Sequence, residues 1–275
     1  MTGDRCVDRD TSAAPGSCSS PPCRSGDHIQ GSLAREVIRT VIIEFFGMPG
    51  AGKSVLAEQL TWVLSEQGEP ARLITEAVAP AVGVPRRYVR KGLMAVSQGL
   101  RRPSAASRVL LALSRSEQSG ASQVLRRWLE LMVTQTIMRR SKPQEMAILD
   151  QGLLQAIWSI GIHGKYQGPI ETLAATSSAW QFPDLVVVVE VPLAQIASRL
   201  DARTSRHSRL QHLDLADQKR QQERGRLLIH AILKDVGSLG LNRDSMVIVE
   251  NPDGASAMEL AQGLAAEAIR RRSQS

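Results

Sequence analysis

Short apolar runs recur along the chain and predict buried β-strands. They are short, rich in β-branched residues and continuous rather than alternating, which is typical of strands covered on both faces of a parallel sheet. The runs are Val41–Phe46, Arg72–Thr75, Met146–Leu149, Leu185–Val189 and Met246–Val249. We therefore expect about five strands.

The segments between these runs carry apolar residues at helical spacing. A first helix is predicted by Leu56, Leu60, Val63 and Leu64, and Gly68 and Pro70 end it. A long, mainly helical stretch follows the second strand, and its later part places Leu125, Leu129, Met132 and Thr136 on one stripe. A last helix is predicted by Ala257, Leu260, Ala261 and Leu264.

Strands that alternate with helices imply right-handed βαβ crossovers and a parallel sheet between helical layers. The predicted fold is a three-layer α/β domain with a helical insertion between strands two and three. Residues 1–36 are rich in Ser, Pro and Gly with little apolar periodicity, so we expect a disordered tail there and one folded domain over 37–275.

The composition of the chain indicates in which compartment the protein works and which ligands suit it. All three cysteines lie in the first 23 residues, and neither an apolar span nor a signal core is evident, so we expect a cytoplasmic protein without a membrane segment. The net charge of +7 suits anionic ligands, but aromatic residues make up only 3% of the chain. That scarcity disfavours a base-stacking nucleic-acid surface.

One motif carries specific chemistry, and it lies between the first predicted strand and the first helix. It matches G-x-x-x-x-G-K-[ST], in which backbone N–H groups cradle phosphates, the lysine meets the β- and γ-phosphates, and the hydroxyl binds Mg²⁺. The residues expected to bind nucleotide are Gly47, Met48, Pro49, Gly50, Ala51, Gly52, Lys53, Ser54 and Val55. We expect Lys53 to lie at the surface.

The class of P-loop protein depends on other motifs. No Asn-Lys-x-Asp tetrapeptide, which guanine-specific switch proteins use to bind the base, is present. A GTPase is therefore a much weaker hypothesis than a kinase. The run before Asp150 offers a single carboxylate, where motor ATPases usually have a longer acidic motif. Asp150, at the predicted end of strand three, is the candidate magnesium ligand and catalytic carboxylate, although an Asp there can also cap the following helix.

Phe46 to Ser54, the strand end at Asp150 and a later Arg-rich segment together resemble the P-loop kinases of nucleosides and nucleotides, and thymidylate kinase in particular. The resemblance implies ATP and Mg²⁺ as cofactors and a lid whose arginines stabilise the transferring phosphoryl group. Arg199, Arg203 and Arg206 lie in the matching region and, if that segment is helical, fall on one face of the helix. We take Arg203 and Arg206 as candidate catalytic residues, with a solvated basic helix as the alternative.

The chain departs from that family at two acceptor positions. Thymidylate kinases have Asp-Arg after strand three, whereas this chain has Asp150-Gln151, which questions a nucleoside monophosphate as acceptor. The family also has Glu-Pro after strand two, whereas here Ala77 follows Glu76. Glu76 is the candidate substrate-binding residue, or simply a polar residue at the end of a strand.

The leading hypothesis is an ATP-dependent kinase of a small-molecule acceptor such as a nucleoside or nucleotide. One alternative is an ATP-binding regulatory protein with slow hydrolysis. Another is a kinase of polynucleotide ends, which the excess of Lys and Arg over Asp and Glu favours and the scarcity of aromatic residues opposes. The sequence does not decide whether the protein forms a homodimer.

Overall fold

The computed structural model describes residues 40–74, 84–202, 215–241 and 243–274. Contacts divide the chain into Met1–Val37 and Ile38–Ser275. The first unit, with the predicted tail, lies outside the described residues. The elements named below all belong to the second unit.

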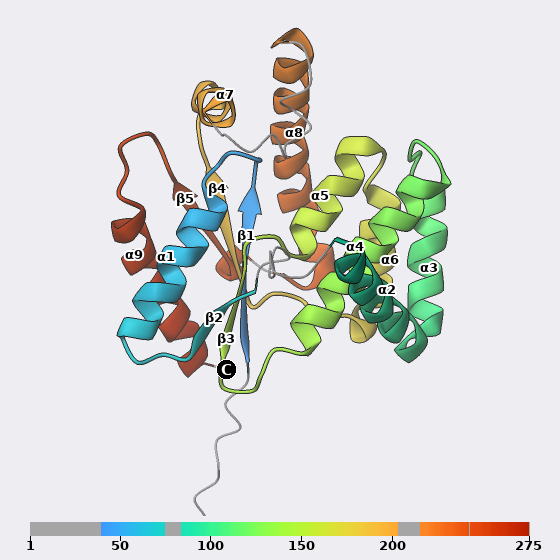
Figure 1. Ribbon diagram of the computed structural model, residues 1–275, viewed down its shortest axis with the longest axis horizontal. Helices are drawn as coiled ribbons and strands as arrows, with labels where there is room; N and C mark the ends of the chain where they lie inside the picture. Colours follow the sequence, from blue (N-terminus) through green and yellow to red (C-terminus); the bar gives the residue numbers. More distant parts are fainter. Residues whose placement is uncertain (1–39, 75–83, 203–214, 242, 275) are drawn as a thin grey trace, which may run out of the picture. The chain divides into compact units, whose positions relative to one another are not determined.

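One five-stranded parallel sheet forms the centre of this unit (Figure 1). Its order is β2-β3-β1-β4-β5, with β1 between β3 and β4. The strands are β1 (Val41–Gly47), β2 (Ala71–Leu73), β3 (Met146–Leu149), β4 (Leu185–Glu190) and β5 (Met246–Glu250). The predicted α/β fold with five parallel strands is confirmed.

Helices cover both faces of the sheet. One face carries α1 (Lys53–Glu66) and α9 (Ala257–Ser273), and the other carries α5 (Leu153–His163) and α8 (Leu215–Asp235) (Figure 1). Between β2 and β3 the chain forms the predicted helical insertion. Its helices are α2 (Val84–Arg101), α3 (Pro103–Ser114) and α4 (Ala121–Arg139).

The remaining elements are short. They are α6 (Gln167–Ala175), α7 (Leu193–Asp201) and the 3₁₀ turns η1 (Ser177–Ala179), η3 (Val236–Leu239) and η4 (Arg243–Ser245). Within the described residues, no helix is both long and apolar enough to cross a membrane.

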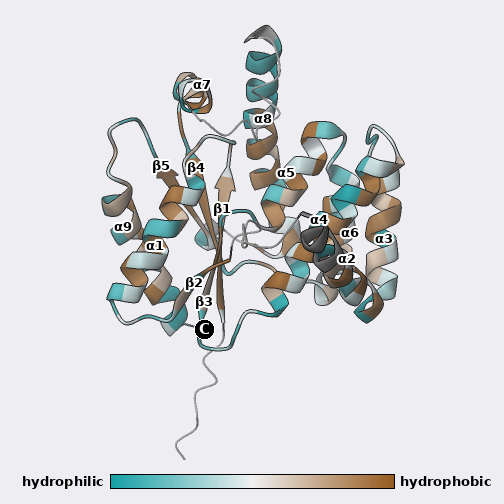
Figure 2. Ribbon diagram, viewed as in Figure 1, coloured by the Kyte–Doolittle hydropathy of each residue, from teal (hydrophilic) through white to brown (hydrophobic). Residues whose placement is uncertain are grey.

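The hydrophobic core is divided by the sheet. Alternate residues of β4 point to opposite faces, so Val187 joins the cluster under α1 and α9 while Val188 joins the cluster under the other helices. Figure 2 shows the strands as the most uniformly hydrophobic elements. The predicted face of α1 is fully confirmed, because Leu56, Leu60, Val63 and Leu64 are all buried.

The stripe predicted on α4 is partly wrong. Leu125 is 52% exposed, whereas Met132 and Thr136 are buried as expected. Because α4 contacts α2, α3 and α5, its buried surface is wide and takes in polar residues such as Arg127 and Gln135. A single apolar stripe does not describe a helix with three neighbours.

Candidate functional site

The predicted P-loop connects β1 to α1 at the carboxyl edge of the sheet, where parallel α/β folds bind ligands. Gly50 and Gly52 have φ values of 91° and 90°, a conformation that favours glycine. Gly47 approaches β4 so closely that a Cβ there would lie 2.5 Å from the Val189 carbonyl oxygen. The glycines are therefore needed both for the turn and for the close packing of the loop.

Lys53 opens α1 and extends back across the loop. Its Nζ donates to the carbonyl oxygens of Gly47 at 2.8 Å and Met48 at 2.9 Å. The expectation of a surface lysine is wrong, since Lys53 is only 9% exposed. A buried ammonium held by two carbonyl groups is a fixed positive charge at the mouth of a phosphate-binding loop.

Ser54, the last residue of the P-loop motif, lies against Asp150. The Ser54 Oγ donates to Asp150 Oδ2 at 3.1 Å, although 96 residues separate the two in sequence. The contact arises because β1 and β3 are neighbours in the sheet and Asp150 follows β3 directly. A hydroxyl and a carboxylate are hard oxygen donors of the kind that Mg²⁺ takes alongside phosphates and water, so these residues fit that ion.

The N-terminus of α5 is satisfied by Glu44 rather than by Asp150. Glu44 is fully buried in the middle of β1, and its carboxylate accepts the backbone N–H of Leu153 at 2.9 Å and of Gln155 at 3.1 Å. Gly152 occupies the N-cap position, and a Cβ there would clash with the Glu44 carboxyl group at 2.4 Å. Asp150 lies outside the helix and remains available to Ser54.

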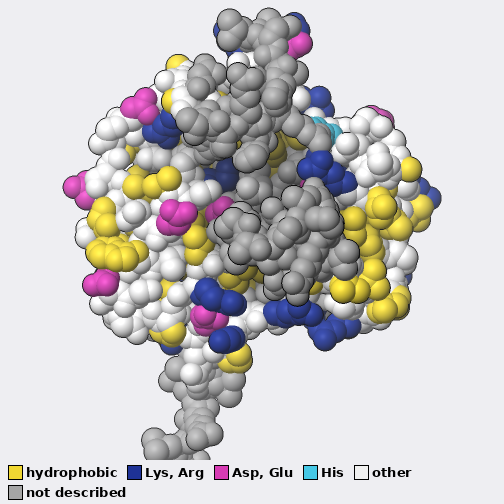
Figure 3. Space-filling model, in the orientation of Figure 1, with side chains coloured by type: hydrophobic (Ala, Val, Ile, Leu, Met, Phe, Trp, Pro, Cys, Tyr) yellow, Lys and Arg dark blue, Asp and Glu magenta, His cyan; other side chains and the backbone are white. Residues whose placement is uncertain are grey.

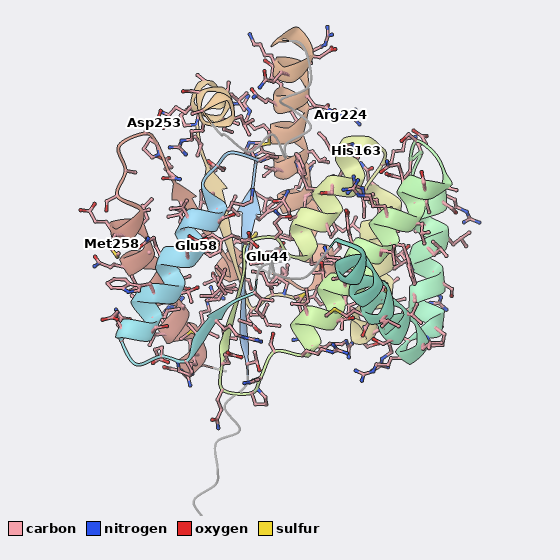
Figure 4. The ribbon with its side chains drawn as sticks, in the orientation of Figure 1. Glu44, Glu58, His163, Arg224, Asp253 and Met258 are labelled. Atoms are coloured by element: carbon pink, nitrogen blue, oxygen red, sulfur yellow. The ribbon has the colours of Figure 1, made fainter. Side chains whose placement is uncertain are left out.

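Burial raises the pKa of Glu44 to about 7, while the backbone hydrogen bonds from α5 oppose that rise. Figure 4 shows Glu44 between the sheet and the helices on its α5–α8 face. The sequence analysis missed this residue. Its signal was present, because Glu44 is the one charged residue in the apolar run Val41–Phe46.

A polar pocket of about 230 Å³ opens next to Asp150, between α4 and α5. Arg127 of α4 is 5% exposed and donates from Nη1 to Glu130 at 2.5 Å, but its Nε–H has no partner. Gln155 of α5 is also buried, and its Oε1 has no partner either. Both residues line the pocket, and these two polar atoms are desolvated without a partner, which is costly.

The Arg199 side chain forms hydrogen bonds to the loop that follows β5 instead of projecting into solvent. Its Nε donates to Asp253 at 2.9 Å and its Nη2 donates to the Asn251 carbonyl oxygen, also at 2.9 Å. Asn251 in turn donates from Nδ2 to Ala51 in the P-loop at 2.9 Å. Arg199 therefore anchors the β5–α9 loop next to the nucleotide site.

The other predicted site residues divide into two groups. Val55 lies in α1 with its side chain 52% exposed, so only its backbone N–H is placed to serve the loop. Glu76, Arg203 and Arg206 lie outside the described residues, and their proposed roles stay predictions.

Residues 42–228 match the protein family described as an AAA domain. The chain belongs to this family. The family match, the P-loop and the parallel sheet together support the P-loop nucleotide-kinase-like character expected from the sequence. No curated protein matches the chain. Among solved structures, thymidylate kinase from Candida albicans aligns with 85% of this chain and 94% of its own, at 16% identity and a TM-score of 0.48.

Proposed function

We propose that this P-loop protein is an ATP-dependent phosphotransferase acting on a small-molecule acceptor. The observation that carries the proposal is the 3.1 Å contact between Ser54 and Asp150 beside the polar pocket of α4 and α5. A nucleotide-binding loop, a metal-binding pair and an adjacent pocket are the parts that phosphoryl transfer requires, because the reaction depends mainly on positioning and electrostatic stabilisation.

The nucleotide's phosphates would lie against the backbone N–H groups of the P-loop, with Lys53 beside the β- and γ-phosphates. Magnesium, when bound by Ser54 and Asp150, supplies charge neutralisation at the phosphates. In transfer, the bond from the γ-phosphorus to the oxygen that links it to the β-phosphate breaks. A bond to the acceptor oxygen forms, and Asp150 takes the hydroxyl proton.

The pocket between α4 and α5 is the proposed acceptor site. Its size suits a ring-sized polar group, and the Arg127 guanidinium and the Gln155 amide on its walls suit an acceptor that offers a hydrogen-bond acceptor beside a donor. A nucleobase edge has this pattern, as do amide-bearing metabolites. Gln151, which stands where the related kinases have arginine, also lines the pocket.

Transfer of label from [γ-³²P]ATP to pooled nucleosides, nucleotides and hydroxylated metabolites tests the proposal. We expect a labelled small molecule, and release of inorganic phosphate alone would favour a regulatory ATPase instead. Labelled oligonucleotide ends would indicate the polynucleotide-end kinase.

Asp150→Asn provides the sharpest variant for the same assay. Asn cannot accept the hydroxyl proton, so turnover should fall by about 10²- to 10⁴-fold. The melting temperature should hold, because Glu44 and not Asp150 caps α5. Asp244→Asn, in an exposed residue just before β5, is the matched control and should keep full activity. Near-full transfer by Asp150→Asn would remove Asp150 from the mechanism.

A further inference from the structure

A second cavity, of about 350 Å³, shares no lining residue with the α4–α5 pocket. The carboxyl ends of β4 and β5, the start of α7 and one face of α8 form its walls. Its apolar lining comes from Met48, Val188, Val191, Leu193 and Ile229. Lys53, Ser54 and Asp150 do not line it, so it adjoins the P-loop at Met48 without containing the groups proposed for phosphoryl transfer.

Two carboxylates stand side by side on one wall. Glu190 and Glu250 are register partners on the neighbouring parallel strands β4 and β5, so their side chains project to the same face of the sheet. On the opposite wall, Arg226 and His230 are four residues apart on α8 and share one helical face. One wall of the cavity therefore carries acidic side chains, and the other carries basic side chains.

The four polar groups do not neutralise one another. Among the ion pairs formed by described residues, none joins Glu190 or Glu250 to Arg226 or His230. A ligand that carries both charges can bridge the two walls, and the apolar lining between them can cover a hydrophobic body. The volume lies at the lower end of the range for small-molecule sites.

We propose that this cavity binds a small zwitterion with an apolar body, of the size of a hydrophobic amino acid. The ammonium group pairs with Glu190 and Glu250. The anionic group pairs with Arg226 and accepts a hydrogen bond from His230.

The cavity also reaches the P-loop through Met48. The Met48 side chain packs against α8, where a Cβ at Gly225 would come within 2.9 Å of its sulfur, and the Met48 carbonyl oxygen accepts from Lys53 Nζ at 2.9 Å. A ligand that shifts Met48 changes the carbonyl group that holds Lys53. Binding of the zwitterion and binding of ADP are therefore coupled, and the coupling is reciprocal.

Isothermal titration of the full chain without nucleotide tests the site. The probes are L-leucine, L-phenylalanine and L-tryptophan, together with 2-phenylethylamine and 3-phenylpropanoate, which each lack one charge of phenylalanine. We expect at least one amino acid to bind. For phenylalanine we expect about tenfold tighter binding than for either singly charged analogue.

Two variants separate the walls. Glu190→Gln combined with Glu250→Gln should abolish the preference for phenylalanine over phenylpropanoate, and Arg226→Gln should abolish the preference over phenylethylamine. Glu223→Gln, on α8 but outside the cavity, is the control that should bind like wild type. No saturable binding of the three amino acids, or unchanged affinity in the two wall variants, overturns the proposal.

The coupling has its own measurement. A saturating amino acid should change the ADP dissociation constant by about fivefold or more, in line with ordinary allosteric couplings. An unchanged ADP dissociation constant overturns the coupling. Because these titrations need no phosphoryl transfer, their outcome is independent of whether the chain is a kinase.

Discussion

The two faces of the central sheet differ in how completely they satisfy their own side chains. Under α1 and α9 the core is aliphatic apart from Phe45, and neither helix carries a buried polar atom without a partner. The opposite face buries Trp158, Tyr166 and Trp180. It also holds buried, unpaired side-chain atoms of Gln98, Arg127, Gln155, Gln218 and Gln222.

This difference leads us to expect a scaffold on one face and a binding surface on the other. Buried donors and acceptors without partners reduce stability, so each needs an explanation such as a ligand or an ordered water. Exposed apolar side chains do not distinguish the faces, because Leu93 and Leu100 of α2 are 67% and 76% exposed and Trp62 of α1 is 53% exposed. Figure 3 shows hydrophobic side chains on both sides of the view. The α1–α9 face packs behind the P-loop, and the α5–α8 face carries the pocket proposed for the acceptor.

The largest expected effect concerns the loop at which the two faces meet. Lys53→Ala removes the buried ammonium held at the carbonyl groups of Gly47 and Met48. Turnover should fall by roughly 10²- to 10³-fold, and ADP should lose most of its thermal stabilisation of the protein. Lys219→Ala, at an exposed position of α8, is the control. Undiminished stabilisation by ADP would mean that Lys53 does not meet the phosphates.

A core substitution tests whether the α1–α9 face is purely a scaffold. Leu60→Ala should lower the free energy of unfolding by about 2 to 5 kcal/mol in urea titrations, because Leu60 is fully buried under α9. ADP affinity, measured per folded molecule, should be unchanged. Glu58→Ala on the exposed side of α1 should have little effect on either quantity. A loss of ADP affinity in Leu60→Ala alone would break the distinction between the faces.

Glu44 should make stability depend on pH. Its folded pKa of about 7 exceeds its ordinary 4.5, so the folded state binds more protons between these values, and stability falls as pH rises through that window. The cost at pH 8 is on the order of 3 kcal/mol, and below pH 4.5 it disappears. Glu44→Gln removes the titration, so its free energy of unfolding should change less than that of wild type between pH 5 and 8. Parallel pH profiles would show that the carboxylate does not titrate in this range.

The smallest effect should run in the opposite direction. Gln222 of α8 is buried and its Nε2 has no partner, so Gln222→Leu should raise the free energy of unfolding by about 1 kcal/mol. Gln221→Leu, at a less buried position, should be near neutral. A destabilised Gln222→Leu would show that this amide is satisfied in solution and would weaken the contrast between the faces.

The sequence predicts the scaffold better than the site for a physical reason. A strand buried on both faces is apolar along most of its length, so Met146–Leu149 and Leu185–Val189 are evident without knowledge of their neighbours. The P-loop is equally local, because its glycines and Lys53 act through the backbone of one turn. The juxtaposition of Ser54 and Asp150 followed from the rule that parallel strands present ligands at one edge.

The remaining features depend on partners distant in the sequence. Nothing near Glu44 shows that it caps a helix more than 100 residues away, and nothing near Arg199 identifies Asp253 as its partner. The unpaired Arg127 and Gln155 become a pocket only when α4 packs against α5. Helical periodicity cannot reveal such pairs, because it describes one helix at a time.

The hydrogen bond from Asn251 to Ala51 joins residues 200 positions apart. During synthesis the ribosome releases the P-loop long before β5 and the residue that pins the loop. A nascent chain that ends before Asn251 lacks this bond and the Arg199 anchor built on it. The phosphate-binding loop therefore reaches its final form only after Asn251 has been synthesised, and a product truncated before that residue would carry the motif without the hydrogen bond that holds it.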